Sequence, residues 1–269
     1  MEHVRRIFRL LLILPVIAMA CQTVPITGRE QLSIVPASQI LPMSFDEYRD
    51  FLSKHPAVAQ GEQAAMVRRV GQRIQSAVEH YFAEKGLSSR LEGYQWEFHL
   101  VQDKEANAWC MPGGKVVVYT GILPATKDEN GLAVVLGHEI AHAVANHGGE
   151  RMSQALLVEM GGLTLDAALQ RSPSQTNGLF LAAYGLGAQV GLLLPYSRLH
   201  ESEADHLGLI FMALAGYDPR GAVTFWERMM SSKQGSAPPE LLSSHPADRH
   251  RIENIQKLLP EAMAYYRPQ

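Results

Sequence analysis

The chain has 269 residues, of which 46% are hydrophobic and 19% are charged, and its formal net charge is -3 at pH 7. This apolar content excludes an intrinsically disordered protein and is sufficient for a hydrophobic core. The slightly acidic balance argues against a nucleic-acid partner. Only two cysteines are present, which excludes a disulfide-stapled scaffold, and we expect Cys110 to be a small buried residue rather than a reactive thiol.

The first twenty residues have the pattern of a targeting segment. Three arginines precede an apolar run that is too short for a membrane-spanning helix of about 20 residues, and this is the arrangement of a secretory signal peptide. Ala18-Met19-Ala20-Cys21 resembles the bacterial lipobox, and Gln22 favours sorting to the outer membrane. We therefore expect a signal peptide over residues 1–20, lipidation of Cys21, and a location in the bacterial periplasm with a lipid anchor in the outer membrane. An ordinary cleaved signal and an uncleaved anchor are the alternatives.

The remainder of the chain predicts a mainly helical protein with a small sheet. Residues 21–43 have the composition of a tether, and residues 44–269 form the expected domain. Apolar residues at three- and four-residue spacing predict helices, whereas alternation or a short apolar run predicts strands. The expected helices cover residues 44–86, 129–146, 150–169, 198–215, 219–232 and 247–259, and the expected strands cover residues 94–101 and 116–120. This element content predicts an α+β fold.

An uncharged stretch over residues 178–195 is nearly long enough to span a membrane. It contains Gln189 and Pro195 and lacks a basic flank close before it. These features favour a helix that is buried in the protein or at an interface over a membrane span.

The helix expected over residues 129–146 carries three polar residues in an apolar setting: His138, Glu139 and His142. The two histidines are four residues apart, so both imidazoles project from one face and can bind one ion, for which zinc is the natural choice. Glu139 is rotated by about 100° from His138, which leaves it free to accept a proton. This is the His-Glu-x-x-His arrangement of zinc peptidases, with Glu139 as the general base.

A catalytic zinc needs a third protein ligand from elsewhere in the chain. The longer metzincin motif is excluded because Ala145 and Gly148 occupy the positions of its glycine and histidine. The best downstream candidates are Glu201 and Asp205, which are four residues apart on a predicted helix. One carboxylate can bind zinc while the other orients a ligand histidine. Glu203 points elsewhere and is the weaker candidate.

Together, the segments 138–142 and 197–205 resemble the HtpX-like and CAAX-prenyl-protease-like family of zinc endopeptidases. Three further segments look like the family's periplasmic lipoprotein members and its mitochondrial stress-protease member: Pro25–Arg29, Asn107–Lys115 and Ala215–Pro219. The resemblance implies a gluzincin-type domain with a small mixed sheet beside the motif helix. It also implies one zinc ion per chain on His138, His142 and Glu201, with Asp205 beside them and Glu139 as general base and general acid.

A less specific match places two more residues at the site. Ser244-His245-Pro246 and Arg251 resemble a family element that holds a histidine and an arginine over the zinc. His245 would either donate a hydrogen bond to the developing oxyanion or occupy the open metal position and keep the enzyme inactive. A helix-capping His-Pro pair without a catalytic role is the third interpretation.

The expected reaction is hydrolysis of peptide bonds in misfolded or misassembled envelope proteins, as protein quality control. An unfolded substrate would add as a strand to an edge of the small sheet, and residues 115–120 are the expected edge strand. The alternative is a zinc-containing chaperone or assembly factor whose site stays closed.

Overall fold

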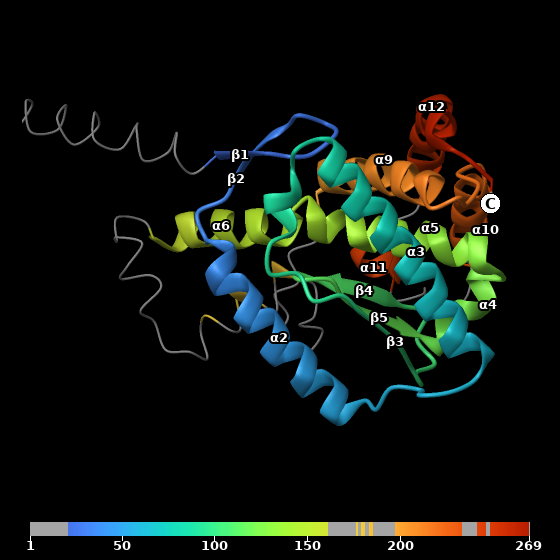
Figure 1. Cartoon of the computed structure of the whole chain (residues 1–269), viewed down its shortest axis with the longest axis horizontal. Helices are drawn as coiled ribbons and strands as arrows, with labels where there is room; N and C mark the ends of the chain where they lie inside the picture. The colour runs from blue at the N-terminus through green and yellow to red at the C-terminus, as the bar shows by residue number, and fades with distance from the viewer. Residues whose placement is uncertain are drawn as a thin grey trace, which may run out of the picture.

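The structure, a computed structural model, describes residues 21–160, 176, 179–180, 183–184, 197–232, 241–245 and 248–268 (Figure 1). The strands are β1 (Cys21–Thr23), β2 (Glu30–Leu32), β3 (Glu97–Val101), β4 (Ala108–Met111) and β5 (Lys115–Tyr119). The α-helices are α2 (Ala37–Lys54), α3 (Glu62–Glu84), α4 (Leu123–Thr126), α5 (Glu129–Val144), α6 (His147–Met160), α9 (Arg198–Leu214), α10 (Gly221–Ser232), α11 (Leu241–Ser244) and α12 (Arg249–Tyr265). Two short 3-10 helices, η1 (Ser88–Leu91) and η2 (Thr120–Ile122), complete the described elements.

The main sheet is mixed and has the strand order β3-β5-β4. β3 runs parallel to β5, whereas β4 runs antiparallel to it, and β1 and β2 form a separate hairpin. The prediction that residues 115–120 form an edge strand is wrong, because β5 is the central strand. Its three valines, Val116–Val118, are fully buried. A continuous apolar run is typical of a strand that is covered on both faces.

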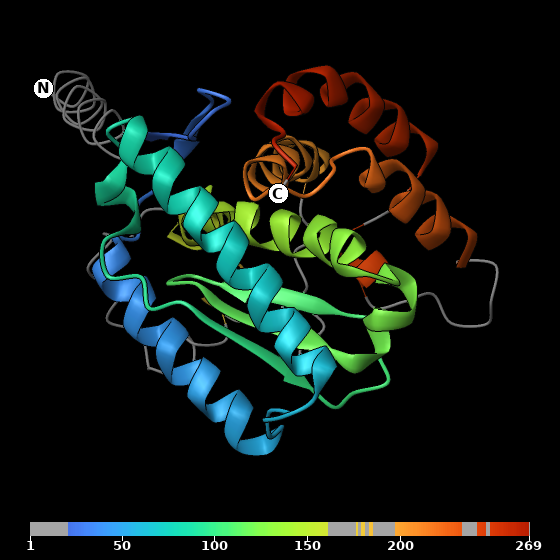
Figure 2. The same ribbon diagram turned by 45° about the vertical axis from the view of Figure 1, so that its right-hand side comes forward.

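Helices cover both faces of this sheet. Phe98, Leu100 and Cys110 face the core that α3 and α5 build on one side. Trp109 and Val117 alternate with them and face the other side, where α2 lies. Figure 2 shows α3 and α5 over one face of the sheet and α2 along the other.

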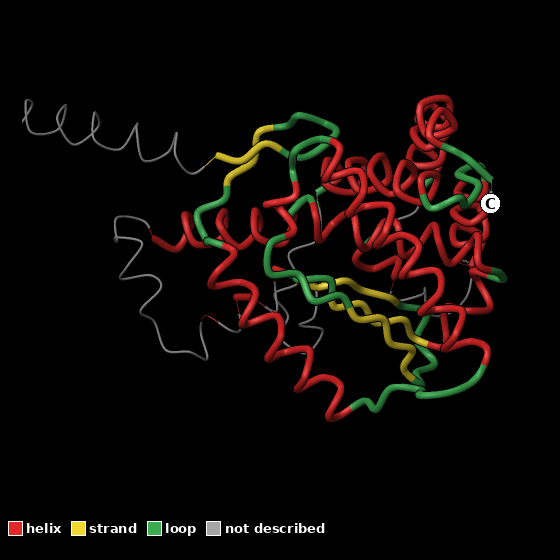
Figure 3. Tube along the Cα trace, in the orientation of Figure 1, coloured by secondary structure: helices red, strands yellow, loops and turns green. Residues whose placement is uncertain are grey.

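Helix α5 is the central helix of the protein. It packs on β4 with one side and on α9 with another, and α12 packs on α9 in turn. Figure 3 shows this group of helices on one side of the yellow strands. All residues from Gly131 to Val144 are buried, so the polar side chains in this part of the helix are shielded from bulk solvent.

The predicted fold class, a mainly helical α+β domain with a small mixed sheet, is confirmed. Besides the position of β5 in the sheet, two predicted segments differ in the structure. The pattern over residues 44–86 forms two helices, α2 and α3, because Pro56 disfavours a helical conformation at His55, where α2 ends. The predicted tether over residues 21–43 contains the β1–β2 hairpin and the first turns of α2.

The uncharged stretch over residues 178–195 lies almost entirely outside the described residues, so its environment stays a prediction. Among the helices that the structure describes, none combines the length and the apolar character that a membrane span requires.

Candidate metal centre

Helix α5 presents two histidines on one buried face. The helix begins after Asp128, whose side chain accepts a hydrogen bond from the Gly131 backbone N–H at 2.8 Å. His138 and His142 are each 3% exposed, and their Nε2 atoms are 3.1 Å apart. The four-residue spacing thus aims both imidazoles at one point, as the sequence motif predicts.

Helix α9 adds a carboxylate at the same point. Ser197 caps this helix by accepting a hydrogen bond from the backbone N–H of His200. One turn into the helix, Glu201 Oε1 lies 3.3 Å from His142 Nε2, and Glu201 Oε2 lies 3.5 Å from His138 Nε2. The structure therefore brings the predicted third ligand against the first two.

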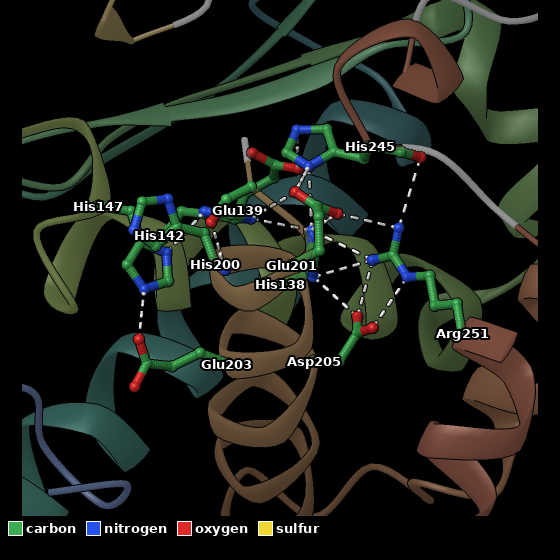
Figure 4. A network of polar contacts seen from close by, with 11 residues as sticks. His138, Glu139, His142, His147, His200, Glu201, Glu203, Asp205, His245 and Arg251 are labelled. Atoms are coloured by element: carbon green, nitrogen blue, oxygen red, sulfur yellow. Dashed lines mark hydrogen bonds and ion pairs between the residues drawn. The ribbon is translucent and has the colours of Figure 1, made fainter. Parts of the chain in front are cut away.

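A fourth donor comes from the residue that follows α11. His245 Nδ1 lies 2.8 Å from Glu201 Oε1 and 3.1 Å from His138 Nε2 (Figure 4). Donor atoms of His138, His142, Glu201 and His245 all lie within 4.8 Å of one another, and all four residues are buried.

This arrangement of donors fits a zinc ion. Ligand atoms on a tetrahedral zinc with bonds of about 2.0–2.1 Å stand about 3.3 Å apart. The separations between these donors run from 2.8 to 3.5 Å. Three imidazoles and a carboxylate are also the ligand types that zinc accepts. A buried cluster of this composition is therefore a candidate metal-binding site.

Glu139 lies beside these donors on α5. Its Oε1 atom is 3.5 Å from His245 Nε2 and accepts no hydrogen bond from the described residues. Burial raises the pKa of Glu139 to about 7. A carboxylate whose pKa lies near neutral pH is suited to accept a proton and return it.

Arg251 and Asp205 support the donors from α12 and α9. Arg251 forms a two-pronged ion pair with Asp205, with Nε–Oδ2 2.8 Å and Nη2–Oδ1 2.7 Å. The guanidinium carbon lies 3.4 Å from the centre of the Trp226 ring. Asp205 Oδ1 is 3.0 Å from His138 Nδ1, so Asp205 contacts the nitrogen of His138 that faces away from the metal position.

Charge interactions stabilise the contacts of Asp205 with Arg251 and His138. Burial alone raises the pKa of Asp205, but the Arg251 charge and the His138 hydrogen bond outweigh it, so the pKa lies below its ordinary value. Arg251 Nη1 also lies 3.0 Å from Glu201 Oε2. The structure thus places Arg251 against two carboxylates of the site.

Sequence reasoning missed a second buried polar cluster next to His142. It consists of His147, His200, Glu150, Glu203 and Arg29, all of which are linked by hydrogen bonds or ring contacts. Burial lowers the pKa of His147 to about 4, against the opposing hydrogen bond with Glu203. The available signals were a histidine soon after the motif and an unexplained arginine in the segment Pro25–Arg29, but neither spacing points to a known type of site.

Comparisons with known proteins agree with this geometry. The sequence profile described as peptidase family M48 matches residues 69–259. The chain is 36% identical to the mitochondrial metalloendopeptidase OMA1 of Schizosaccharomyces pombe, over 89% of this chain and 66% of that protein. It is 31% identical to the human metalloendopeptidase OMA1, over 89% of this chain and 46% of that protein. It is 26% identical to the beta-barrel assembly-enhancing protease of Escherichia coli, over 90% of this chain and 48% of that protein.

These matches confirm the resemblance to a family of metalloendopeptidases and the prediction of a metallopeptidase as the enzyme class. The chain spans less than two thirds of the length of the relatives it matches. Lipidation of Cys21 and the domain boundaries stay predictions.

The predicted location, a bacterial periplasm with a lipid anchor in the outer membrane, is wrong. Relatives that share 31–36% identity with the chain are mitochondrial enzymes, whereas the bacterial protease shares 26%. The physical reason is that mitochondrial targeting segments are also rich in arginine and poor in acidic residues, so the arginines before the apolar run do not identify the compartment.

Proposed function

Because the chain belongs to peptidase family M48, we propose that it is a zinc-dependent endopeptidase that cleaves extended segments of misfolded or misassembled proteins. The observation that carries this proposal is the convergence of His138, His142 and Glu201 on one point beside the carboxylate of Glu139. Three protein ligands with a general base next to them are the equipment of a hydrolytic zinc site.

In this proposal His138, His142 and Glu201 hold the metal. When bound, zinc lowers the pKa of water and polarises a carbonyl group. Glu139 accepts the proton of the attacking water and later returns it to the leaving amine. Asp205 holds the ring of His138 in place, and Arg251 keeps Asp205 and Glu201 ionised and oriented.

Strand β4 is the best candidate for the substrate-binding edge. It ends the sheet order β3-β5-β4 and packs directly on α5, which carries the metal ligands. A peptide in extended conformation can add to such an edge through backbone hydrogen bonds, whereas a folded protein cannot. This requirement supports unfolded segments as the substrate class.

The test of this function is cleavage of an unfolded protein such as casein, with and without a zinc chelator. We expect cleavage that the chelator abolishes and added zinc restores. Cleavage that persists after complete removal of metal would contradict the assignment.

The position of His245 favours a second candidate function, a zinc-containing chaperone or assembly factor with a closed site. Its Nδ1 atom occupies a fourth donor position, next to Glu201 and His138. A site with four protein ligands is typical of structural zinc, whereas a catalytic site keeps one position open. The same cleavage assay separates the two functions, because a closed assembly factor binds zinc and unfolded protein without hydrolysing it.

A further inference from the structure

The second buried polar cluster contacts the proposed metal ligand His142 on the side of its ring that faces away from the metal position. His147 lies at the start of α6 and is fully buried. Its Nδ1 atom is 2.9 Å from Nδ1 of His142, on the side of that ring opposite the Nε2 atom that faces the metal position. Figure 4 shows His147 next to His142, and His147 also contacts Glu203.

The proton positions along these contacts follow from the chemistry of each group. A nitrogen that binds a metal carries no proton, so Nδ1 of His142 must carry the ring proton and donate it. Nδ1 of His147 then accepts this hydrogen bond, and Nε2 of His147 carries the proton of its own ring. That N–H donates to Glu203 Oε2 at 3.0 Å. Each hydrogen bond in the series His142–His147–Glu203 therefore has one donor and one acceptor.

Glu203 is held as an acceptor by the segment between β1 and β2. Arg29 donates from Nε to Glu203 Oε2 at 2.8 Å, and the Thr27 hydroxyl donates to the other carboxylate oxygen. Both carboxylate oxygens of Glu203 thus accept hydrogen bonds from this segment, and Oε2 is held toward the N–H of His147.

Arg29 also binds a second carboxylate, that of Glu150, and a variant of Glu150 can serve as a control for a variant of Glu203. It donates to Glu150 from Nη1 at 3.0 Å and from Nη2 at 2.8 Å. Glu150 pairs with His200 at 2.9 Å. Glu150 and Glu203 are each 5% exposed and share the same arginine, but Glu203 bonds the histidine whose Nδ1 atom contacts Nδ1 of His142.

From this geometry we infer that His147 and Glu203 are positioning residues that fix the proton and the ring orientation of His142 as a metal ligand. Thr27 and Arg29 hold Glu203 in place for this role. The inference rests on the proposed zinc site. Outer hydrogen-bond partners of metal ligands contribute about 10–100-fold to metal affinity.

The experiment compares zinc affinities of purified variants by competition with a chelator of known affinity. We expect Glu203→Gln to weaken zinc binding about tenfold and His147→Leu to weaken it about 10–100-fold. Glu150→Gln removes an equally buried partner of Arg29 and is expected to keep the wild-type zinc affinity. Visible absorption of the cobalt-substituted proteins reports the ligand geometry independently of activity, and we expect it to change in His147→Leu and not in Glu150→Gln.

A conservative variant separates positioning from packing. The side-chain amide of His147→Gln can accept from His142 through its oxygen and donate to Glu203 through its nitrogen. We therefore expect His147→Gln to bind zinc more tightly than His147→Leu. If His147→Leu does not fold, the comparison of Glu203→Gln, Glu150→Gln and His147→Gln carries the test.

Each outcome has a distinct meaning. If the wild-type protein binds zinc and Glu203→Gln binds it equally tightly, the positioning role is overturned while the proposed function stands. Equal losses of zinc affinity in Glu203→Gln and Glu150→Gln overturn the positioning role as well, because such losses come only from the arginine, Arg29, that both carboxylates bind. A wild-type protein that binds no zinc overturns the proposed function, and the positioning role with it.

Discussion

Gly137 of α5 and Gly208 of α9 lie back to back where the two helices cross. A β-carbon at Gly137 would lie 2.8 Å from the carbonyl oxygen of Gly208, and one at Gly208 would lie 2.9 Å from the backbone nitrogen of His138. Neither position has room for a side chain. This close approach of the two backbones brings Glu201 within 3.3 Å of His142 Nε2, so two glycines determine the spacing of the metal donors.

Gly208→Ala should therefore separate the helices and loosen the metal centre. We expect the free energy of unfolding to fall by about 1–3 kcal/mol, since the added methyl group meets backbone atoms. Zinc affinity should fall as well, because Glu201 moves away from the histidines. Urea unfolding and chelator competition measure the two effects. Ser202→Ala, on the same helix, serves as the control, and wild-type zinc affinity in Gly208→Ala would refute the spacing role.

Glu139→Gln removes the proposed general base and keeps the size of the side chain. We expect the cleavage rate of casein to fall by about 100- to 10,000-fold, because the amide cannot accept the proton. Zinc content, measured by metal analysis, should equal that of the wild type, since Glu139 is not among the four clustered donors. Substantial turnover by the zinc-loaded variant would exclude Glu139 as the base.

His245→Ala removes the fourth donor and should open the metal position. Because Nδ1 of His245 contacts both Glu201 and His138, we expect cleavage per bound zinc to rise several-fold while zinc affinity falls. The control is His250→Ala, an exposed histidine on α12. A fall in cleavage by His245→Ala would support hydrogen bonding to the oxyanion instead of occupation of the metal position.

Arg251→Lys keeps the charge and removes the planar fork that binds Asp205. Lysine cannot make both hydrogen bonds at once or stack on Trp226 as the guanidinium does. We expect thermal and urea unfolding to show a loss of about 2–3 kcal/mol, because two buried carboxylates lose part of their compensation. Arg249→Lys, at the exposed start of the same helix, should be neutral. Equal stability of both variants would contradict this account.

Glu150→Gln should reduce the stability of the protein at neutral pH and flatten its response to acid. Burial alone raises the pKa of Glu150, but His200 and Arg29 outweigh it and lower that pKa from 4.5 to about 2. A lowered pKa in the folded state adds stability that is complete above the unfolded value and is lost as the pH falls from about 4.5 to about 2. We expect a difference of about 2 kcal/mol at pH 7 that shrinks across this range.

Urea unfolding of both proteins at several pH values measures this difference. Asp50→Asn removes the exposed ion pair with Lys54 and should not alter the pH dependence. A constant difference between wild type and Glu150→Gln down to pH 2 would mean that the carboxylate does not act through its charge.

Local spacing was enough to predict part of this site. His138 and His142, and Glu201 and Asp205, are pairs on one helix, so the helical repeat alone places each pair on one face. The Pro56 break escaped prediction because helical periodicity resumes at Met66, so the pattern predicts a single helix. Strand β4 escaped prediction because it is only four residues long. The contacts of His147 with Glu203 and of Glu203 with Arg29 join segments that only the packed fold brings together, and no spacing rule connects them.

The Arg29–Glu203 hydrogen bond joins residues that are 174 positions apart in the chain. Closing a loop of this length depends on the prior folding of what lies between, and contacts of large sequence separation form late. At a synthesis rate of about 5–20 residues per second, the two partners emerge at least about 9 s apart. The interval delays completion of the hydrogen bonds behind His142, so a partly synthesised chain does not yet carry the full support of its metal ligands.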